Sequence, residues 1–171
     1  MKKIIFSFFI IGVLLLSLPS NLSKPIFPPC IKQEYSKQLI KNKILKLNSN
    51  TINSYKLSEI IRRESIKNNI SPELILAIIK VESNFDENAK SPKNARGLMQ
   101  IRKIVLKDLK MLINHKELYN SETNIKIGTL YLAKLIKRFN SVEKALNYYN
   151  SGSIKRTSYS KKVLRVYNEL M

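Results

Sequence analysis

The chain has 171 residues, of which 31 are basic and 12 are acidic, so its formal net charge is +19. This length accommodates one ordinary domain and a targeting segment. The single cysteine, Cys30, excludes an intramolecular disulfide, and the single histidine, His115, has no partner at the spacing that metal or Ser–His chemistry needs. We therefore expect a fold held by its apolar core, no metal or cofactor, and His115 in a solvent-facing loop.

Residues 1–23 have the layout of a secretory signal peptide. Lys2 and Lys3 precede an uncharged stretch from Ile4 to Leu18, and small polar residues follow it. The stretch is short for a membrane span, which needs about 20 apolar residues. We predict a signal peptide or an uncleaved N-terminal anchor, and in either case export to the periplasm or cell envelope. Export favours a membrane or a carboxylate-bearing wall over nucleic acid as the anionic partner. An Ile-, Asn- and Lys-rich composition set by the genome explains the charge equally well.

Residues 24–51 are predicted to form a basic tether. Lysines are spread over a stretch with one acid, Glu34, and apolar residues recur at helical spacing: Tyr35, Leu39 or Ile40, Ile44 and Leu47. A basic amphipathic helix here would lie on an anionic membrane, giving membrane contact through residues 1–48, or would pack on the domain. Both alternatives remain open, and Cys30 is expected as an unpaired thiol in this linker.

Residues 52–171 are predicted to form one all-α domain, with strands minor or absent. A first helix is expected near residues 56–69. Ser71, Pro72 and Glu73 then supply an N-cap, a first-turn proline and a first-turn acid, and the helix that they start is apolar nearly all round. We expect this second helix to run through the centre of the domain.

The second half of the predicted domain is also helical. After a polar loop over residues 84–96, helical spacing resumes behind Gly97 and continues to Leu112. Further helices are expected from a Ser121 cap to about residue 139, over residues 142–149, and from residue 158 to the end. Gly128 lies inside one of them, where glycine costs about 1 kcal/mol relative to alanine, which indicates a close helix–helix contact.

Glu82 ends the predicted central helix, immediately before the polar loop. The negative end of the helix dipole and the apolar helix both favour the neutral carboxyl, so we expect a raised pKa. A carboxyl that stays protonated near neutral pH is what cleavage of a glycosidic bond requires, because the leaving oxygen must receive a proton. A glutamate at a helix end is usually a solvated surface residue. The sequence around Glu82 must therefore show whether it is a catalytic residue.

Four blocks of sequence around and after Glu82 resemble the soluble lytic transglycosylase (SLT) catalytic domain family. The blocks are Glu82-Ser83 with Ser91-Pro92-Lys93-Asn94-Ala95-Arg96-Gly97-Leu98-Met99-Gln100-Ile101, then Asn124-Ile125-x-x-Gly128-x-x-Tyr131-Leu132-x-x-Leu135, then Tyr148-Tyr149-Asn150-Ser151-Gly152, and finally Tyr159 with Val163-Leu164 and Tyr167. They follow in order over about residues 56–170. The resemblance implies a goose-lysozyme-like fold that acts on peptidoglycan between N-acetylmuramic acid and N-acetylglucosamine.

The resemblance also implies roles for individual residues. Glu82 matches the family's catalytic glutamate, which acts as acid and then as base on the muramic C6 hydroxyl, giving 1,6-anhydromuramic ends without water or a cofactor. The residues matched to substrate binding are Ser91, Met99, Gln100, Tyr149, Asn150 and Tyr159. Ser91 is otherwise a turn residue before Pro92, and Met99 is otherwise core. Tyr149 would stack on a sugar or hydrogen-bond Glu82.

Three departures from the family pattern bear on the site. Asn94 stands where the family usually has glycine, but asparagine also tolerates a left-handed backbone, so the turn can survive. Arg102-Lys103 replace the common Met-Pro after Gln100-Ile101, which removes an apolar wall. Residues 155–158, before Tyr159, lack the usual Glu-Thr pair.

Two other functions remain open beside the transglycosylase. A hydrolytic lysozyme of the same fold would need a second carboxylate, for which Asp86 and Glu122 are the candidates. In the other, a non-catalytic cationic wall- or membrane-binding protein, Glu82 would be vestigial and have no catalytic role. A small exported domain of this kind suits local clearance of the wall for an envelope-spanning secretion or conjugation apparatus as well as general wall turnover.

Overall fold

The structure is a computed structural model that describes residues 29–51, 53–155 and 157–171. The predicted signal peptide, residues 1–23, lies outside the described residues. The elements are α1 (Pro29–Leu47), α2 (Ser54–Asn68), α3 (Pro72–Ser83), α4 (Lys103–Asp108), the 3-10 helix η1 (His115–Tyr119), α5 (Ser121–Phe139), α6 (Val142–Ser151) and α7 (Ser158–Leu170). Isolated bridges join Lys90 to Arg96 and Arg96 to Ile101, and the described ranges contain no longer strand. The all-α prediction is confirmed.

Helix α3 forms the centre of the fold, as its composition predicts. The Ser71 side chain accepts a hydrogen bond from the Leu74 amide at 3.1 Å, and Pro72 occupies the first turn, where its missing N–H costs nothing. The six residues from Leu74 to Ile79 are all buried. A helix apolar on every side has to be covered all round, and this requirement decides where its neighbours lie.

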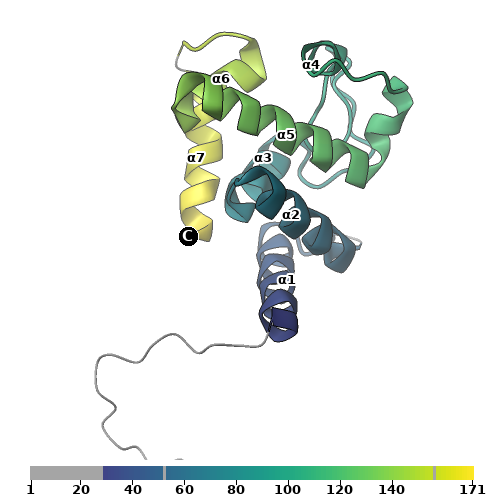
Figure 1. The fold of residues 1–171 in the computed structure, drawn as a ribbon, viewed down its shortest axis with the longest axis vertical. Coiled ribbons are helices and arrows are strands. Elements are labelled where there is room, and N and C mark those ends of the chain that lie inside the picture. Colours follow the sequence, from purple (N-terminus) through teal and green to yellow (C-terminus); the bar gives the residue numbers. More distant parts are fainter. Residues whose placement is uncertain (1–28, 52, 156) are drawn as a thin grey trace, which may run out of the picture.

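The other helices surround α3 and close the core. Helix α2 packs on α5, α5 on α6, and α7 lies along α3. Figure 1 shows α5 crossing the molecule, with α6 and α7 at one of its ends and α4 near the other. The C-terminal end of α3 and the C-terminal end of α6 both contribute to one pocket, which is described below.

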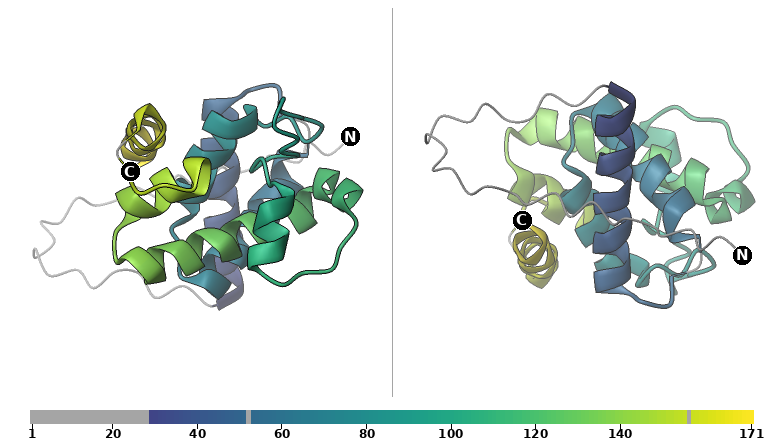
Figure 2. Two further views of the ribbon diagram at one scale, coloured as in Figure 1. Left: turned by 90° about the horizontal axis from the view of Figure 1, so that it is seen from above. Right: turned by 90° about the horizontal axis from the view of Figure 1, so that it is seen from below.

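Helix α1 is a packed part of this unit rather than a tether beside it. Ile40 and Ile44 lie in the hydrophobic core, whereas Leu39 is 43% exposed. The Lys43 ammonium pairs with Glu73 at 2.6 Å, and Lys80 donates to the Leu47 carbonyl at 2.7 Å. The view from below in Figure 2 shows α1 lying across one face of the molecule. Helix α1 therefore packs on the domain, which is the second of the two alternatives, and residues 24–28 of the predicted tether lie outside the described residues.

No helix within residues 29–51, 53–155 and 157–171 has the length and apolar character needed to cross a membrane. Among the side chains of α1 that the structure describes, the buried ones are Lys37, Ile40 and Ile44, and so few buried apolar residues explain why the basic sequence indicates a tether.

The predicted long helix after Gly97 is wrong. Gln100 adopts a left-handed backbone (φ 49°), and Ile101 bridges to Arg96, so residues 97–101 form turns. The helix that follows, α4, has six residues and is ended by Lys110 (φ 53°). The apolar residues at helical spacing do not share one buried face: Ile101 and Val105 are buried, whereas Ile104 is 49% exposed and Leu112 is fully exposed.

Two smaller expectations in the same half are also corrected. His115 is 9% exposed and begins η1, which the sequence did not predict, and its pKa is lowered, first by burial and then by Arg96 and Lys103. The cap of α5 is Asn120 rather than Ser121, because the Asn120 side chain accepts from the Thr123 amide at 3.0 Å.

Candidate active site

Glu82 occupies the last turn of α3, where the chain leaves the core. Asn84 (φ 51°) and Phe85 (φ 68°) both adopt left-handed backbone, and the Asn84 amide donates to the Lys80 carbonyl at 3.2 Å. A left-handed phenylalanine is strained, and burial of its ring holds it there. The helix therefore ends abruptly, with Glu82 at the border between the core and a pocket.

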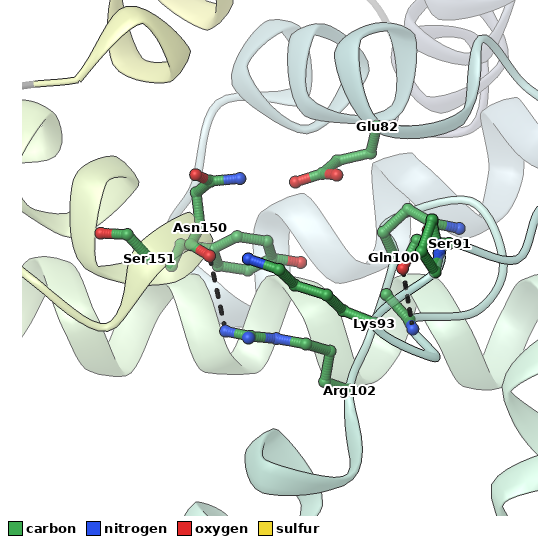
Figure 3. Close-up of a pocket in the computed structure, with 10 residues that line it drawn as sticks. Glu82, Ser91, Lys93, Gln100, Arg102, Asn150 and Ser151 are labelled. Atoms are coloured by element: carbon green, nitrogen blue, oxygen red, sulfur yellow. Dashed lines mark hydrogen bonds between the residues drawn. The ribbon is translucent and has the colours of Figure 1, made fainter.

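Glu82 forms one wall of a pocket of about 400 Å³ (Figure 3). The pocket is lined by Glu82, Ser91, Pro92, Lys93, Ala95, Gln100, Arg102, Tyr149, Asn150 and Ser151. These residues come from the end of α3, the loop over residues 91–102 and the end of α6. Figure 3 shows the Glu82 carboxyl and the Asn150 amide pointing toward one another across it. The structure thus brings together five of the predicted site residues, and Met99 and Tyr159 are not in the lining.

Burial governs the acidity of Glu82. Desolvation raises its pKa from 4.5 to about 7, opposed first by the Tyr159 hydroxyl and then by the charge of Arg102. Removing a carboxylate from water disfavours its charged form, and the two polar neighbours recover only part of that loss. A large fraction of Glu82 is therefore protonated at neutral pH, as a general acid must be.

Two buried tyrosines lie near Glu82: Tyr149 lines the pocket, and Tyr159 does not. The Tyr149 hydroxyl donates to the Met99 carbonyl at 2.9 Å, so it is not engaged with Glu82. Tyr159, at the start of α7, is 8% exposed, and its hydroxyl lowers the pKa of Glu82 but has no hydrogen-bond partner within the geometric limits among the described residues. Burial and the neighbouring Glu82 raise the pKa of both phenols well above 10, so they remain neutral. Tyr159 therefore acts on the acid rather than lining the pocket.

The loop wall of the pocket is shaped by hydrogen bonds of its own side chains. The Ser91 hydroxyl accepts from the Ala95 amide at 3.1 Å, and Asn94 has the expected left-handed backbone (φ 58°). The Gln100 amide nitrogen donates to the carbonyls of Ala89 (3.0 Å) and Gly97 (2.9 Å). Ser91 thus serves in the turn and lines the pocket at once, and the Gln100 side-chain oxygen remains available as an acceptor.

Beneath the loop, Met99 and Asn124 hold it to α5. The Met99 side chain is fully buried, and a Cβ on Gly128 would lie 2.5 Å from its sulfur. The expected close contact at Gly128 therefore exists, but its partner is the loop methionine rather than a second helix. A fully buried side chain cannot contact a glycan, so Met99 supports the site as core, not as a substrate contact.

Asn124 is a supporting residue to which the sequence reasoning assigned no role. Its side chain accepts from the Met99 amide at 2.7 Å and donates to the carbonyls of Arg96 (2.8 Å) and Leu118 (2.7 Å). Gly97 is required beside it, because a Cβ there would lie 2.4 Å from the Asn124 amide nitrogen. An asparagine on the buried face of an otherwise apolar helix stripe is the signal that could have indicated this role.

Lys93 and Arg102 also line the pocket and were not among the predicted site residues. Arg102 donates to the Asn150 carbonyl at 3.4 Å, and Lys93 reaches across the pocket toward Asn150 (Figure 3). Their closeness in sequence to Ser91 and Gln100 was the available signal.

Neither candidate for a second carboxylate lies at this pocket. Asp86 accepts from the Asn88 amide at 2.9 Å within its own loop, and Glu122 pairs with Arg63 at 2.9 Å. Among the described residues that line the pocket, Glu82 is the one carboxylic acid. The arrangement can donate and accept a proton at a single carboxyl, in a cavity with several hydrogen-bonding groups.

Comparison with known sequences gives consistent matches over this region. A sequence model of the family described as "Transglycosylase SLT domain" matches residues 59–167. Membrane-bound lytic murein transglycosylase E of Buchnera aphidicola (subspecies Acyrthosiphon pisum) is 34% identical over 122 residues, which cover 67% of this chain and 52% of that protein. Membrane-bound lytic murein transglycosylase C of Photorhabdus laumondii is 36% identical over 89 residues, covering 48% of this chain and 25% of that protein.

Solved structures show the same fold. The 70 kDa soluble lytic transglycosylase of Escherichia coli superposes with a TM-score of 0.59 at 23% identity, over 81% of this chain and 29% of that one. An inactive variant of the lytic transglycosylase Slt of Pseudomonas aeruginosa gives a TM-score of 0.56 at 20% identity, with the same coverage. The chain spans about half, or less, of the length of these proteins.

Proposed function

The chain belongs to the transglycosylase SLT domain family, and on that premise we propose that it is a lytic transglycosylase. Its substrate is the peptidoglycan glycan strand, cut between N-acetylmuramic acid and N-acetylglucosamine. The observation that carries the proposal is a single carboxyl, Glu82, half-buried at a pocket, with a pKa raised to about 7 by that burial.

In the proposed reaction, Glu82 first acts as the acid. It gives its proton to the glycosidic oxygen as the bond from that oxygen to the muramic C1 breaks. The resulting Glu82 carboxylate then takes the proton of the C6 hydroxyl of the same muramic residue while O6 bonds to C1. The products are a free N-acetylglucosamine hydroxyl and a 1,6-anhydromuramic end. Glu82 regains its proton, and no water is consumed.

The pocket suits this reaction better than hydrolysis. An inverting glycosidase needs a second carboxylate to activate water, and a retaining one needs it as a nucleophile. Asp86 and Glu122 are engaged elsewhere, so an internal hydroxyl of the substrate is the simpler nucleophile. We assign Gln100, Ser91 and Asn150 to hydrogen bonds with the sugar, because all three line the pocket with amide or hydroxyl groups.

The decisive experiment compares residues 24–171 with the same chain carrying Glu82→Gln. Each is incubated with purified peptidoglycan, and the released fragments are identified by mass spectrometry. We expect anhydromuropeptides from the wild type, and a rate lower by about 10²–10⁴ in the variant, because glutamine cannot give a proton. Reducing-end products would indicate a lysozyme instead. Equal turnover by both chains would remove Glu82 from the mechanism.

We propose a cell-envelope location for this activity. The similarity to proteins named membrane-bound lytic murein transglycosylases and the signal-peptide layout of residues 1–23 support it. Membrane contact through residues 1–48, and service to an envelope-spanning secretion or conjugation apparatus, are further proposals. Fractionation of cells that express the full chain, with and without residues 1–23, tests the location.

A further inference from the structure

Two cationic side chains project into the pocket that holds Glu82. Arg102 precedes α4 and is partly buried, and Lys93 lies on the exposed loop. Figure 3 shows both reaching toward Asn150 from the side of the pocket opposite Glu82. The guanidinium of Arg102 makes one long hydrogen bond, 3.4 Å to the Asn150 carbonyl, so most of its donors are left for a ligand.

Neither Lys93 nor Arg102 forms an ion pair within the described residues. In the part of the chain that the structure describes, the ion pairs join Lys37 to Glu34, Lys43 to Glu73, and Arg63 to Glu64 and Glu122. The pocket's own carboxylic acid is Glu82, which the proposed reaction requires in its neutral form. At the moment of catalysis the pocket therefore carries two positive charges without a matching negative one.

This arrangement works against the acid unless a substrate supplies the missing charge. The charged and titratable groups that act on Glu82 are Arg102, Tyr149 and Tyr159, with Lys93 on the same pocket. Arg102 lowers the pKa of Glu82, and so weakens its hold on the proton that it must donate. An anion bound to Arg102 would cancel that field and restore the neutral acid.

We propose that Lys93 and Arg102 together bind a carboxylate of the glycan substrate beside the scissile bond. The inference rests on the proposed function, because it takes this pocket as the place of cleavage. The planar guanidinium fork matches a carboxylate in two parallel hydrogen bonds, and the lysine adds a point charge. The carboxylate has two possible sources: the lactyl group of a muramic residue without a stem peptide, or the stem peptide itself.

Two matched pairs of soluble glycan fragments distinguish these sources. The first pair is stripped of stem peptides, with its lactyl carboxylates free or converted to carboxamides. The second pair carries stem peptides, with their carboxylates free or converted. We expect kcat/KM about tenfold higher for the free form in one of the pairs, as a charge-assisted hydrogen bond allows. Preference within the first pair identifies the lactyl group, and preference within the second identifies the stem.

Variants of the pocket residues test whether Lys93 and Arg102 cause the preference for the free carboxylate. Arg102→Met should reduce it to about two-fold or less, Arg102→Lys should retain most of it, and Lys93→Met should weaken it in part. The control is Lys103→Met, which removes the same charge from an exposed neighbour outside the pocket lining and should leave the preference intact. If Lys103→Met abolished the preference to the same extent, the preference would come from the overall positive charge of the chain and not from the pocket.

Binding keeps this inference separable from the proposed reaction. The Glu82→Gln variant is mixed with the same four fragments, and dissociation constants are measured without turnover. Tighter binding of a free-carboxylate form, lost in the Glu82→Gln, Arg102→Met double variant, supports the carboxylate site even if no anhydro product forms. Equal binding and equal kcat/KM within both pairs would overturn it, while anhydro products from all four fragments would leave the proposed function standing.

Discussion

At the scale of single residues, Glu82 is placed where its ionised form is disfavoured. It follows six consecutive buried residues of α3 and is backed by the buried rings of Tyr149 and Tyr159. Tyr159 and Arg102 moderate the effect of burial without cancelling it, and the pKa remains at about 7. Both the activity and the stability of the protein should therefore depend on pH through the titration of Glu82.

Activity should decrease as pH rises through the pKa of Glu82. The acid must be protonated in the free enzyme, so kcat/KM is expected to be highest below about pH 6 and to fall about tenfold per pH unit above about pH 7. The measurement is kcat/KM on soluble glycan strands from about pH 5 to about pH 9. A profile that stays level across this range would rule out Glu82 as the acid.

Stability should respond to the same group in the same direction. The folded-state pKa of Glu82 is raised from 4.5 to about 7, so its contribution to stability is complete below about pH 4.5 and is lost as pH rises through about 7. Glu82→Gln removes the titration. The difference in free energy of unfolding, variant minus wild type, should therefore increase by up to about 3 kcal/mol between about pH 4.5 and about pH 8.

Urea unfolding of both chains at the two pH values measures this difference, and all other titrating groups cancel in the comparison. An unchanged difference between the two pH values would show that Glu82 has an ordinary pKa in the folded protein.

The sequence predicts that Glu82 lies at the end of a helix, and α3 does end at Ser83; the role of Glu82 as the acid stays a prediction. The sequence predicts less about which neighbouring side chains turn toward the pocket. Met99 stands beside Gln100, yet one is fully buried and the other lines the pocket, because Gln100 has a left-handed backbone. A single backbone angle, which periodicity does not encode, separates core from site here. For Arg102 the sequence offers two signals, its closeness to Gln100 and its departure from the family pattern, and neither shows which way the side chain points.

At the scale of elements, α1 tests how far the packed domain extends. Ile44 is completely buried against the core, whereas Leu39 on the same helix is 43% exposed. If α1 belongs to the cooperative unit, Ile44→Ala should lower the free energy of unfolding by about 2–4 kcal/mol, the usual cost of a cavity in a core. Denaturant unfolding of residues 24–171 provides the measurement.

Leu39→Ala is the matched control for Ile44→Ala and should change stability by no more than about 0.5 kcal/mol. Equal, small effects of the two substitutions would show that α1 is a tether outside the cooperatively folded unit.

Helix prediction succeeded where burial repeats with helical spacing and caps mark the ends, as at Ser71 and Pro72. It failed between Gly97 and Leu112, where a compact loop buries Leu98, Met99 and Ile101 without a continuous helix. It also could not place α1, because a helix that covers one side of a domain needs few apolar residues. These failures occur where long-range packing, rather than local spacing, decides the backbone.

At the scale of the whole molecule, the formal net charge of +19 favours contact with an anionic polymer. Adsorption of the Glu82→Gln variant to insoluble peptidoglycan should therefore weaken several-fold between about 50 mM and about 500 mM salt, because salt screens exposed charges. Co-sedimentation at increasing salt measures it. Binding that is indifferent to salt would make the charge a consequence of composition alone.

The end of α1 is fastened to the end of α3. Asn48 donates to the Asn84 carbonyl at 2.8 Å, and Lys80 bridges the Leu47 carbonyl and the Asn84 side chain at 2.7 and 2.6 Å. Asn84 caps the helix two residues after Glu82. These hydrogen bonds join the C-terminal end of α1 to the cap of the helix that carries the proposed acid. A force that displaces α1 would therefore act on the C-terminal end of α3, next to Glu82.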